Sequence, residues 1–117
     1  MLKNQITANQ ILKAIKKGGA TINKNGNFAK YLKNGFMCST CDCSILNITE
    51  LKNIVKTANQ ILKTLKKGEY LGLWVENGFI YIDISKKFFS REFALIYGKI
   101  YNQKSIFDLK TKNCIYL

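Results

Sequence analysis

Apolar side chains recur at helical spacing in three stretches of the chain. In the first stretch the apolar face is formed by Ala8, Ile11, Leu12 and Ile15. The second begins after Thr49, a good N-cap residue, and its apolar face comprises Leu51, Ile54, Val55, Ala58, Leu62 and Leu65. The third is expected between Ser90 and Asn102, with an apolar face formed by Phe93, Ile96, Tyr97 and Ile100. We expect all three faces to be part of the core.

Alternating apolar and polar residues around Asn77-Gly78 predict a β-hairpin with a two-residue turn. This turn pairs Trp74 with Tyr81 and Leu73 with Ile82. One face of the hairpin is then aliphatic and suited to the core: Leu71, Leu73, Val75, Ile80, Ile82 and Ile84. The opposite face carries Tyr70, Trp74, Glu76, Phe79, Tyr81 and Asp83. That face is too aromatic for plain solvent exposure, so either the rest of the chain covers it or it binds a partner. We favour coverage.

The chain contains an internal repeat. Residues 7–18 and 57–68 are identical at ten of twelve positions, and each copy ends in Lys-Lys-Gly, which suits a helix C-terminus. Each copy is followed by a strand-like stretch and an Asn-Gly pair, first at Asn25-Gly26 and then at Asn77-Gly78. This predicts duplicated helix–hairpin units, in repeat-like halves 1–48 and 49–117 of a single domain spanning 1–117.

A last hairpin is expected from residues 105–109 and 114–117. The predicted fold class is therefore α+β, with three helices on an antiparallel sheet. No apolar run approaches the ~20 residues that a membrane-spanning helix needs.

Four cysteines and no histidine give this chain its most specific chemical pattern. Cys38, Cys41 and Cys43 lie within six residues, and Cys114 lies three residues before the last residue of the sequence. A structural zinc ion takes four soft ligands in a tetrahedron, and four thiolates supply them without imidazole. The spacing of Cys38 and Cys41 suits a turn, whereas in an extended segment Cys41 and Cys43 would share a face. We expect a four-cysteine zinc knuckle closed by Cys114.

Other uses of the cysteines remain open. Two disulfides would also account for all four, but residues 1–5 contain no apolar signal segment and a cytosolic chain disfavours stable disulfides. A redox pair of the thioredoxin type lacks its strand–Cys-x-x-Cys–helix context. Four unrelated free thiols are the remaining alternative.

The formal net charge is +12, from 19 basic and seven acidic residues, and Arg91 is the one arginine. A composition rich in lysine, asparagine and isoleucine also arises from AT-rich coding sequences. The charge favours anionic partners, but a single arginine argues against specific reading of a DNA groove. With no histidine, scattered carboxylates and a zinc shell filled by thiolates, we expect no enzymatic activity.

Short motifs between residues 70 and 117 carry a resemblance to a known class of protein. They are Gly72-Leu73-Trp74, residues 81–85, Ala94, Gly98, Asn102-Gln103 and residues 105–109. This segment resembles the C-terminal module of small proteins encoded by phages and mobile elements of Gram-positive bacteria. With the cysteine cluster added, the whole chain resembles a zinc-containing anti-CRISPR protein directed at the type II-A RNA-guided nuclease. The resemblance implies inhibition by binding, a location in the host bacterial cytoplasm, and structural zinc on Cys38, Cys41, Cys43 and Cys114.

A strongly basic protein cannot imitate DNA, so we expect it to bind an acidic or apolar surface of the nuclease, or its guide RNA. The expected contact residues are Lys16, Lys17, Lys66, Lys67, Trp74 and Tyr81. The alternative is a basic, zinc-stabilised accessory protein that binds nucleic acid non-specifically. Such binding would weaken steeply with salt.

Overall fold

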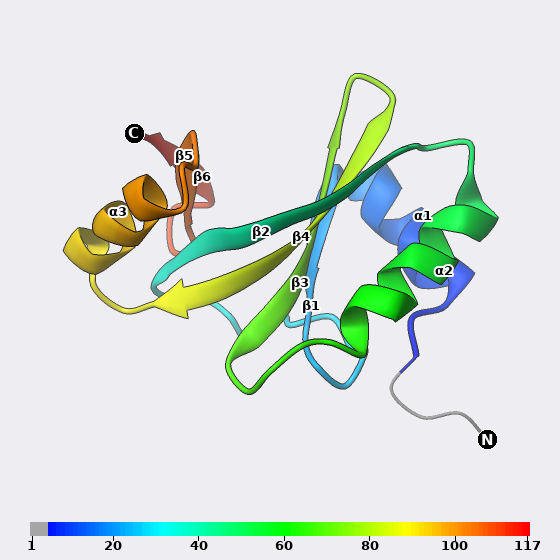
Figure 1. Cartoon of the computed structure of the whole chain (residues 1–117), viewed down its shortest axis with the longest axis horizontal. Helices are drawn as coiled ribbons and strands as arrows, with labels where there is room; N and C mark the ends of the chain where they lie inside the picture. Colours follow the sequence, from blue (N-terminus) through cyan, green and yellow to red (C-terminus); the bar gives the residue numbers. More distant parts are fainter. Residues whose placement is uncertain (1–4) are drawn as a thin grey trace.

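A computed structural model describes residues 5–117, so residues 1–4, part of the segment used above to argue against a signal sequence, lie outside it. The described residues form three helices: α1 (Ala8–Lys17), α2 (Leu51–Leu62) and α3 (Arg91–Ile100). The strands are β1 (Gly19–Ile22), β2 (Phe36–Asn47), β3 (Glu69–Glu76), β4 (Phe79–Phe88), β5 (Ser105–Asp108) and β6 (Asn113–Tyr116). They form one curled antiparallel sheet in the order β1-β3-β4-β2-β5-β6 (Figure 1), which confirms the α+β class.

The β3–β4 hairpin has the predicted register. Trp74 pairs with Tyr81 and Leu73 with Ile82. The turn residues Asn77 and Gly78 both have positive φ, at 52° and 81°, as a type I′ turn requires. Turn chemistry and side-chain alternation therefore specify the same pairing.

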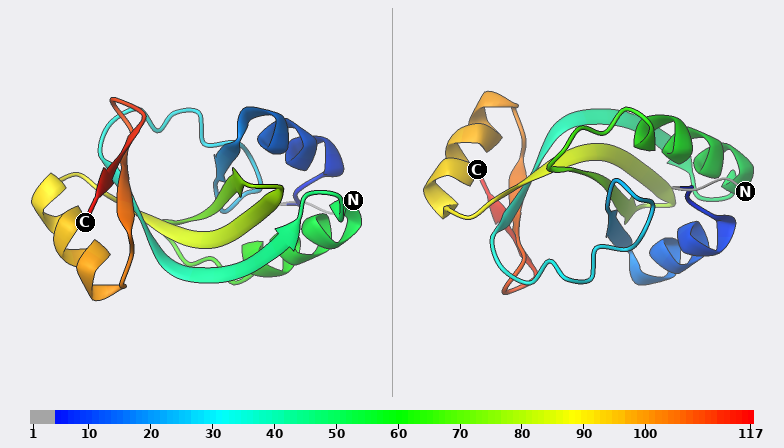
Figure 2. Two further views of the ribbon diagram at one scale, coloured as in Figure 1. Left: turned by 90° about the horizontal axis from the view of Figure 1, so that it is seen from above. Right: turned by 90° about the horizontal axis from the view of Figure 1, so that it is seen from below.

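Two hydrophobic cores of unequal size lie at opposite ends of the sheet. In the larger core, α1 and α2 cover the aliphatic face of β3 and β4, where Leu71, Leu73, Ile80 and Ile82 are buried. The smaller core lies under α3 and contains Cys38, Ala94 and Ile106. Figure 2 shows α1 and α2 at one end of the molecule and α3 with β5 and β6 at the other. The long strands β2 and β4 run between the two ends and belong to both cores.

The repeated segment folds differently in its two copies. In the first copy Thr7 caps α1, and the helix ends at Lys17 before Gly18, whose φ of 89° is left-handed. In the second copy the helix already ends at Leu62, so its Lys-Lys-Gly sequence lies in the turn before β3. The prediction of a helix end at the second Lys-Lys-Gly was therefore wrong.

The first Asn-Gly pair does not form the expected hairpin. The turn at Asn25-Gly26 is followed by a single bridge between Ile22 and Phe28, and the chain then continues as a loop to β2. β1 instead pairs with β3. The equivalence of the two halves thus extends to a helix followed by a strand, and β4 has no counterpart beside β1.

The apolar stripe of α3 faces outward, which corrects the prediction that it faces the core. The buried residues of α3 are Ala94 and Gly98, and these small residues allow the helix to approach β2 and β5 closely. Large side chains remain exposed on its outer side: Phe93, Ile96, Tyr97 and Ile100. Among the residues the structure describes, no helix is long and apolar enough to cross a membrane.

Candidate functional site

The face of the central strands opposite the larger core carries an exposed row of large side chains. Ile45 of β2, Tyr81 of β4 and Trp74 of β3 are neighbours in register across three strands, and Phe79 lies two residues from Tyr81. Trp74 is 47% exposed and Tyr81 36%, and Ile45 and Phe79 are also exposed. We call these four residues the aromatic face. The other half of the chain does not cover it, so the prediction of coverage was wrong.

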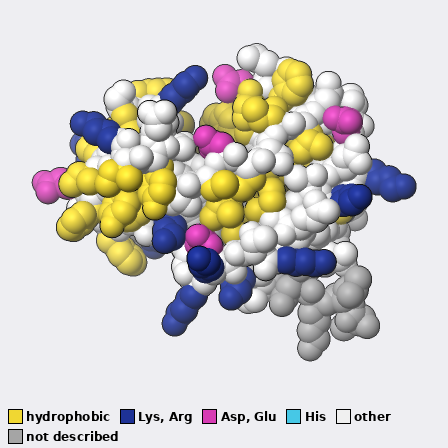
Figure 3. Space-filling view, in the orientation of Figure 1, with side chains coloured by type: hydrophobic (Ala, Val, Ile, Leu, Met, Phe, Trp, Pro, Cys, Tyr) yellow, Lys and Arg dark blue, Asp and Glu magenta, His cyan; other side chains and the backbone are white. Residues whose placement is uncertain are grey.

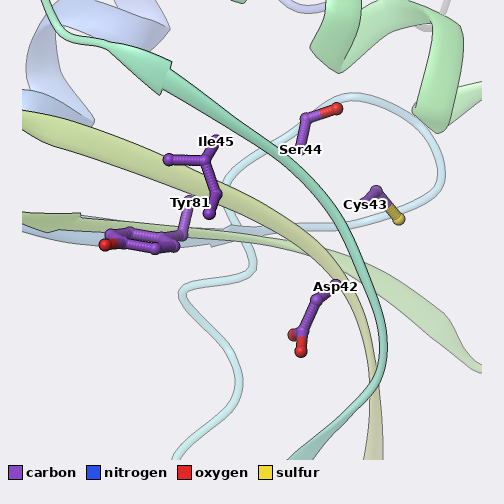
Figure 4. A pocket seen from close by; sticks show the side chains of 5 residues that line it. All are labelled: Asp42, Cys43, Ser44, Ile45 and Tyr81. Carbon is purple, nitrogen blue, oxygen red and sulfur yellow. The ribbon is translucent and has the colours of Figure 1, made fainter.

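A shallow hollow of about 450 Å³ adjoins the aromatic face. It is lined by Asp42, Cys43, Ser44, Ile45 and Tyr81. Figure 4 shows Ile45 and Tyr81 next to each other, with Asp42 on the same side of β2 and the Cys43 side chain on the other. The hollow therefore joins an apolar wall to a carboxylate, an arrangement suited to a side chain that is apolar along its stem and basic at its end.

A second carboxylate lies beside this hollow. Asp83 pairs with Asp42 on β2 and with Gly72 on β3, and Ser85 Oγ donates a hydrogen bond to Asp83 Oδ1 over 2.9 Å. The pKa of Asp83 is raised from 3.8 to about 6: burial is the largest cause and the negative charge of Asp42 adds to it, while the hydrogen bond from Ser85 acts in the opposite direction. Asp83 is therefore an acid whose charged form is disfavoured by its surroundings.

The charge of this face differs from that of the whole protein. Asp42, Glu76 and Asp83 occupy strand positions on it, and no lysine does so from Phe79 to Ser85 of β4 or at their partners on β2 and β3. Lysine side chains stand mainly at the rim of the molecule in Figure 3. A molecule with net charge +12 thus presents an aromatic face with a local excess of carboxylates.

Cys38, Cys41 and Cys43 lie on a strand and not in the expected knuckle turn. β2 continues through them, with shifts in its register against β4 between Ser39 and Cys41 and between Asp42 and Ser44. The thiol sulfurs of Cys41 and Cys43 are 3.2 Å apart. The convergence expected for an extended segment is therefore confirmed.

The structure does not gather all four cysteines. Met37 pairs with Phe107, which pairs with Cys114, so Cys114 shares a face with Met37. Cys38, the next residue on β2, points to the opposite face and is buried against Ala94 under α3. Within residues 5–117, no group of three or more Cys, Asp or Glu side chains is placed to hold a metal ion.

Burial also affects the acidity of two thiols. It raises the pKa of Cys38, and Asp83 contributes. Burial, followed by the neighbouring Cys41, raises the pKa of Cys43 to about 12. Both groups are neutral thiols at pH 7, so a metal ion would have to displace their protons on binding.

Zinc binding by the four cysteines stays a prediction. Metal analysis of protein purified without added zinc is expected to find one zinc per chain, and binding then requires Cys114 and Cys38 to approach each other. Cys114→Ser should lower the melting temperature of the zinc-loaded protein, because structural zinc contributes folding free energy. The matched control is the same comparison in excess chelator, where both proteins should melt alike. A zinc content near zero would contradict the prediction.

The four lysines proposed as contacts lie in two separate places. Lys16 and Lys17 are in the last turn of α1, close to the end of β3, because the Gly18 carbonyl accepts a hydrogen bond from the Val75 amide. Lys66 and Lys67 precede the start of the same strand. The two pairs are thus at opposite ends of β3, and Trp74 and Tyr81 are the expected contact residues that the structure places side by side.

Sequence reasoning missed the carboxylate pair of Asp42 and Asp83, because nothing in a single sequence indicates that β2 pairs with β4. One signal was available. Gly72 interrupts an otherwise apolar strand, and an interior glycine often marks the close approach of another group. That group is the side chain of Asp83.

Comparison with known proteins finds no matching family model, no matching curated protein and no matching solved structure.

Proposed function

We propose that this protein is an inhibitor that acts by binding, and that the aromatic face is its contact surface for a type II-A RNA-guided nuclease. The observation that carries the binding function is the exposed row of Ile45, Tyr81 and Trp74 across three strands. The nuclease as partner rests on the resemblance of residues 70–117 and the cysteine cluster to anti-CRISPR proteins.

The aromatic face has the composition of a binding hot spot. Trp and Tyr supply most of the binding energy in many protein interfaces, because they bury a large area and lose little conformational freedom. Here Trp74 and Tyr81 stand on the two strands of a tight hairpin, and β2 supports β4 on its other side. The side chains are therefore held in place before a partner arrives, which lowers the entropic cost of association.

The local charge suggests which kind of surface is bound. A nuclease that holds a guide–target duplex does so in a positively charged channel. Asp42 and Glu76 suit contact with basic side chains at the edge of such a channel, in place of the acidic surface expected from the net charge, whereas the overall charge of +12 opposes deep insertion. We therefore propose that the protein blocks engagement of target DNA from the rim of the channel. The lysines outside the face would influence the association rate and its salt dependence more than the final affinity.

A cleavage assay tests this function. The protein is mixed with the nuclease–guide complex before target DNA is added, and cleavage is expected to fall. Trp74→Ala and Tyr81→Ala should each weaken inhibition about tenfold to several hundredfold, in the range of hot-spot residues. Tyr116→Ala is the matched control, because Tyr116 is an exposed aromatic residue on β6, far from the aromatic face in the sheet order. Its inhibition should equal that of the unaltered protein.

Undiminished cleavage by several type II-A nucleases at a large molar excess would contradict the proposal. The accessory-protein alternative is favoured by the net charge of +12. It predicts useful affinity for nucleic acid, with a steep fall as salt is raised, and no effect of Trp74→Ala on that affinity.

A further inference from the structure

The exposed face of α3 forms a second apolar surface, at the opposite end of the molecule from α1 and α2. Its centre is the stripe of Phe93, Ile96, Tyr97 and Ile100, of which Phe93 is 60% and Ile100 67% exposed. Tyr97 stacks on Phe88 at 4.9 Å between ring centres and on Tyr101 at 6.2 Å. Figure 3 shows hydrophobic side chains gathered over this end of the molecule.

The surface is large enough to form an interface. The exposed large residues of α3 and of the residues that flank it are Phe89, Phe93, Ile96, Tyr97, Ile100 and Tyr101. With roughly 150–200 Å² for each fully exposed side chain, their exposed parts amount to roughly 500–700 Å². The smaller of the standard protein interfaces bury about 600 Å² on each partner. The area also reaches or exceeds the largest apolar patch of a typical monomer, which is about 300–600 Å².

We propose that α3 is a self-association surface, through which two copies of this chain form an antiparallel, two-fold symmetric helix pair. An axis passing between Ile96 and Tyr97 places Phe93 of one copy against Ile100 of the other. Each apolar residue of the stripe then meets an apolar residue, as an isologous interface requires. This surface is distinct from the aromatic face, so the inference does not depend on the proposed function.

The charges on α3 select a second copy as the occupant. Glu92 and Lys99 lie one residue before Phe93 and Ile100, so they are two helical turns apart on the same flank of the stripe. In an antiparallel pair this flank lies against the same flank of the second copy, which runs in the opposite direction. Glu92 of each copy then lies beside Lys99 of the other, so the dimer contains this pair of charges twice. In a parallel pair the two copies of this flank would lie on opposite sides of the interface, so Glu92 and Lys99 would not meet. Flanking charges of this kind set orientation in paired helices.

The position of the surface also reduces the repulsion between two basic chains. The stripe itself contains no charged residue, and Arg91 is the remaining charged residue of α3 besides Glu92 and Lys99. Most of the charge of +12 lies elsewhere on the chain. Repulsion between such charges is screened over about 10 Å at 0.1 M salt. Association is therefore expected to strengthen as salt is raised, the opposite of the behaviour of a nucleic-acid complex.

Sedimentation of the full chain over a range of concentrations and salt tests the proposal. A mass twice the 13.4 kDa of one chain is expected, with a dissociation constant that falls as salt rises. Ile96→Glu should weaken association about 100-fold or more, because it places two carboxylates together near the axis. Leu12→Glu is the matched control: it adds the same charge at an exposed aliphatic residue of another helix, α1, outside both surfaces, and should leave association unchanged.

A charge exchange tests the antiparallel geometry without removing apolar area. Glu92→Lys and Lys99→Glu should each weaken association, and the double variant should restore it, because the opposite charges meet again. Circular dichroism confirms that each variant keeps its fold. A single-chain mass at every concentration up to hundreds of micromolar would overturn the proposal. A dimer that Ile96→Glu leaves unaffected would overturn it as well. So would an unaltered chain that is monomeric and binds a different protein, if Ile96→Glu abolishes that binding.

Discussion

Replacing Asp83 with asparagine is expected to stabilise the protein at pH 8 by about 2 to 3 kcal/mol and to change stability little near pH 4. The reason is that burial raises the pKa of Asp83 to about 6 in the folded state, against 3.8 for the ordinary side chain. Between these two values the folded protein holds a proton that the unfolded chain releases. The free energy of unfolding therefore falls as pH rises from 4 to 6 and stays lower above it, by about 1.4 kcal/mol for each pKa unit.

Asparagine removes the charge and keeps the shape. Its oxygen still accepts the hydrogen bond from Ser85 Oγ. Urea unfolding at several pH values measures the effect. The free energy of unfolding should decline between pH 4 and 6 in the unaltered protein and should not decline in Asp83→Asn. Asp42→Asn is the control, because it removes the smaller, charge-dependent cause of the raised pKa and should stabilise less at pH 8. An unchanged or lower stability of Asp83→Asn at pH 8 would show that Asp83 is not a destabilised acid.

Gly72→Ala is expected to destabilise the protein by about 1 to 3 kcal/mol, although alanine normally suits a strand better than glycine. A Cβ at this position would lie 3.1 Å from Cγ of Asp83, 3.2 Å from Oγ of Ser85, and closer still to Oδ1 of Asp83. The carboxyl group would have to move and would lose its hydrogen bond from Ser85.

A double-mutant cycle isolates this contact. Thermal unfolding is measured for Gly72→Ala in the natural sequence and in the background of Asp83→Ala, which removes the carboxyl group. In that background the added methyl group should be neutral or slightly stabilising. An equal loss of stability in both backgrounds would place the effect in the backbone or in the contact with Ser85 Oγ, and not in the contact between Gly72 and Asp83.

The features predictable from sequence are those set by neighbouring residues. The register that pairs Trp74 with Tyr81 follows from two turn residues and the alternation on either side, all within twenty residues of chain. The final hairpin was predicted to within one residue at each end of its strands. The α+β class follows from the succession of such local patterns.

The failures concern contacts between distant segments. The repeat at residues 7–18 and 57–68 predicted equal units, yet Asn59 hydrogen-bonds the backbone of Ile6, a role that its counterpart Asn9 does not share within residues 5–117. The stripe of α3 was identified correctly as apolar, but periodicity does not say what covers a stripe. The residues of α3 that are buried against the sheet are Ala94 and Gly98, on the other side of the helix, because their small size permits close packing.

The candidate site was predictable only in part, for the same reason. Trp74 and Tyr81 share a hairpin and could be placed together, whereas Ile45 and Asp42 join them through the pairing of β2 with β4. The cysteines show the limit of spacing arguments. Cys41 and Cys43 converge because they are two residues apart on a strand, but the position of Cys114 relative to Cys38 depends on the order of the whole sheet.

The unequal sizes of the two cores imply that the protein does not open as one unit. The core under α3 has three buried residues, against twelve in the core beneath α1 and α2. The free energy of a local opening rises with the buried apolar area that the opening exposes. The segment formed by α3, β5 and β6 is therefore the less stable cooperative unit. Their amide protons exchange with solvent at lower cost than those of β3 and β4. Each such opening uncovers Cys38, whose thiol is otherwise shielded. The rate at which Cys38 is alkylated therefore reports how often the C-terminal quarter of the chain detaches while the rest stays folded.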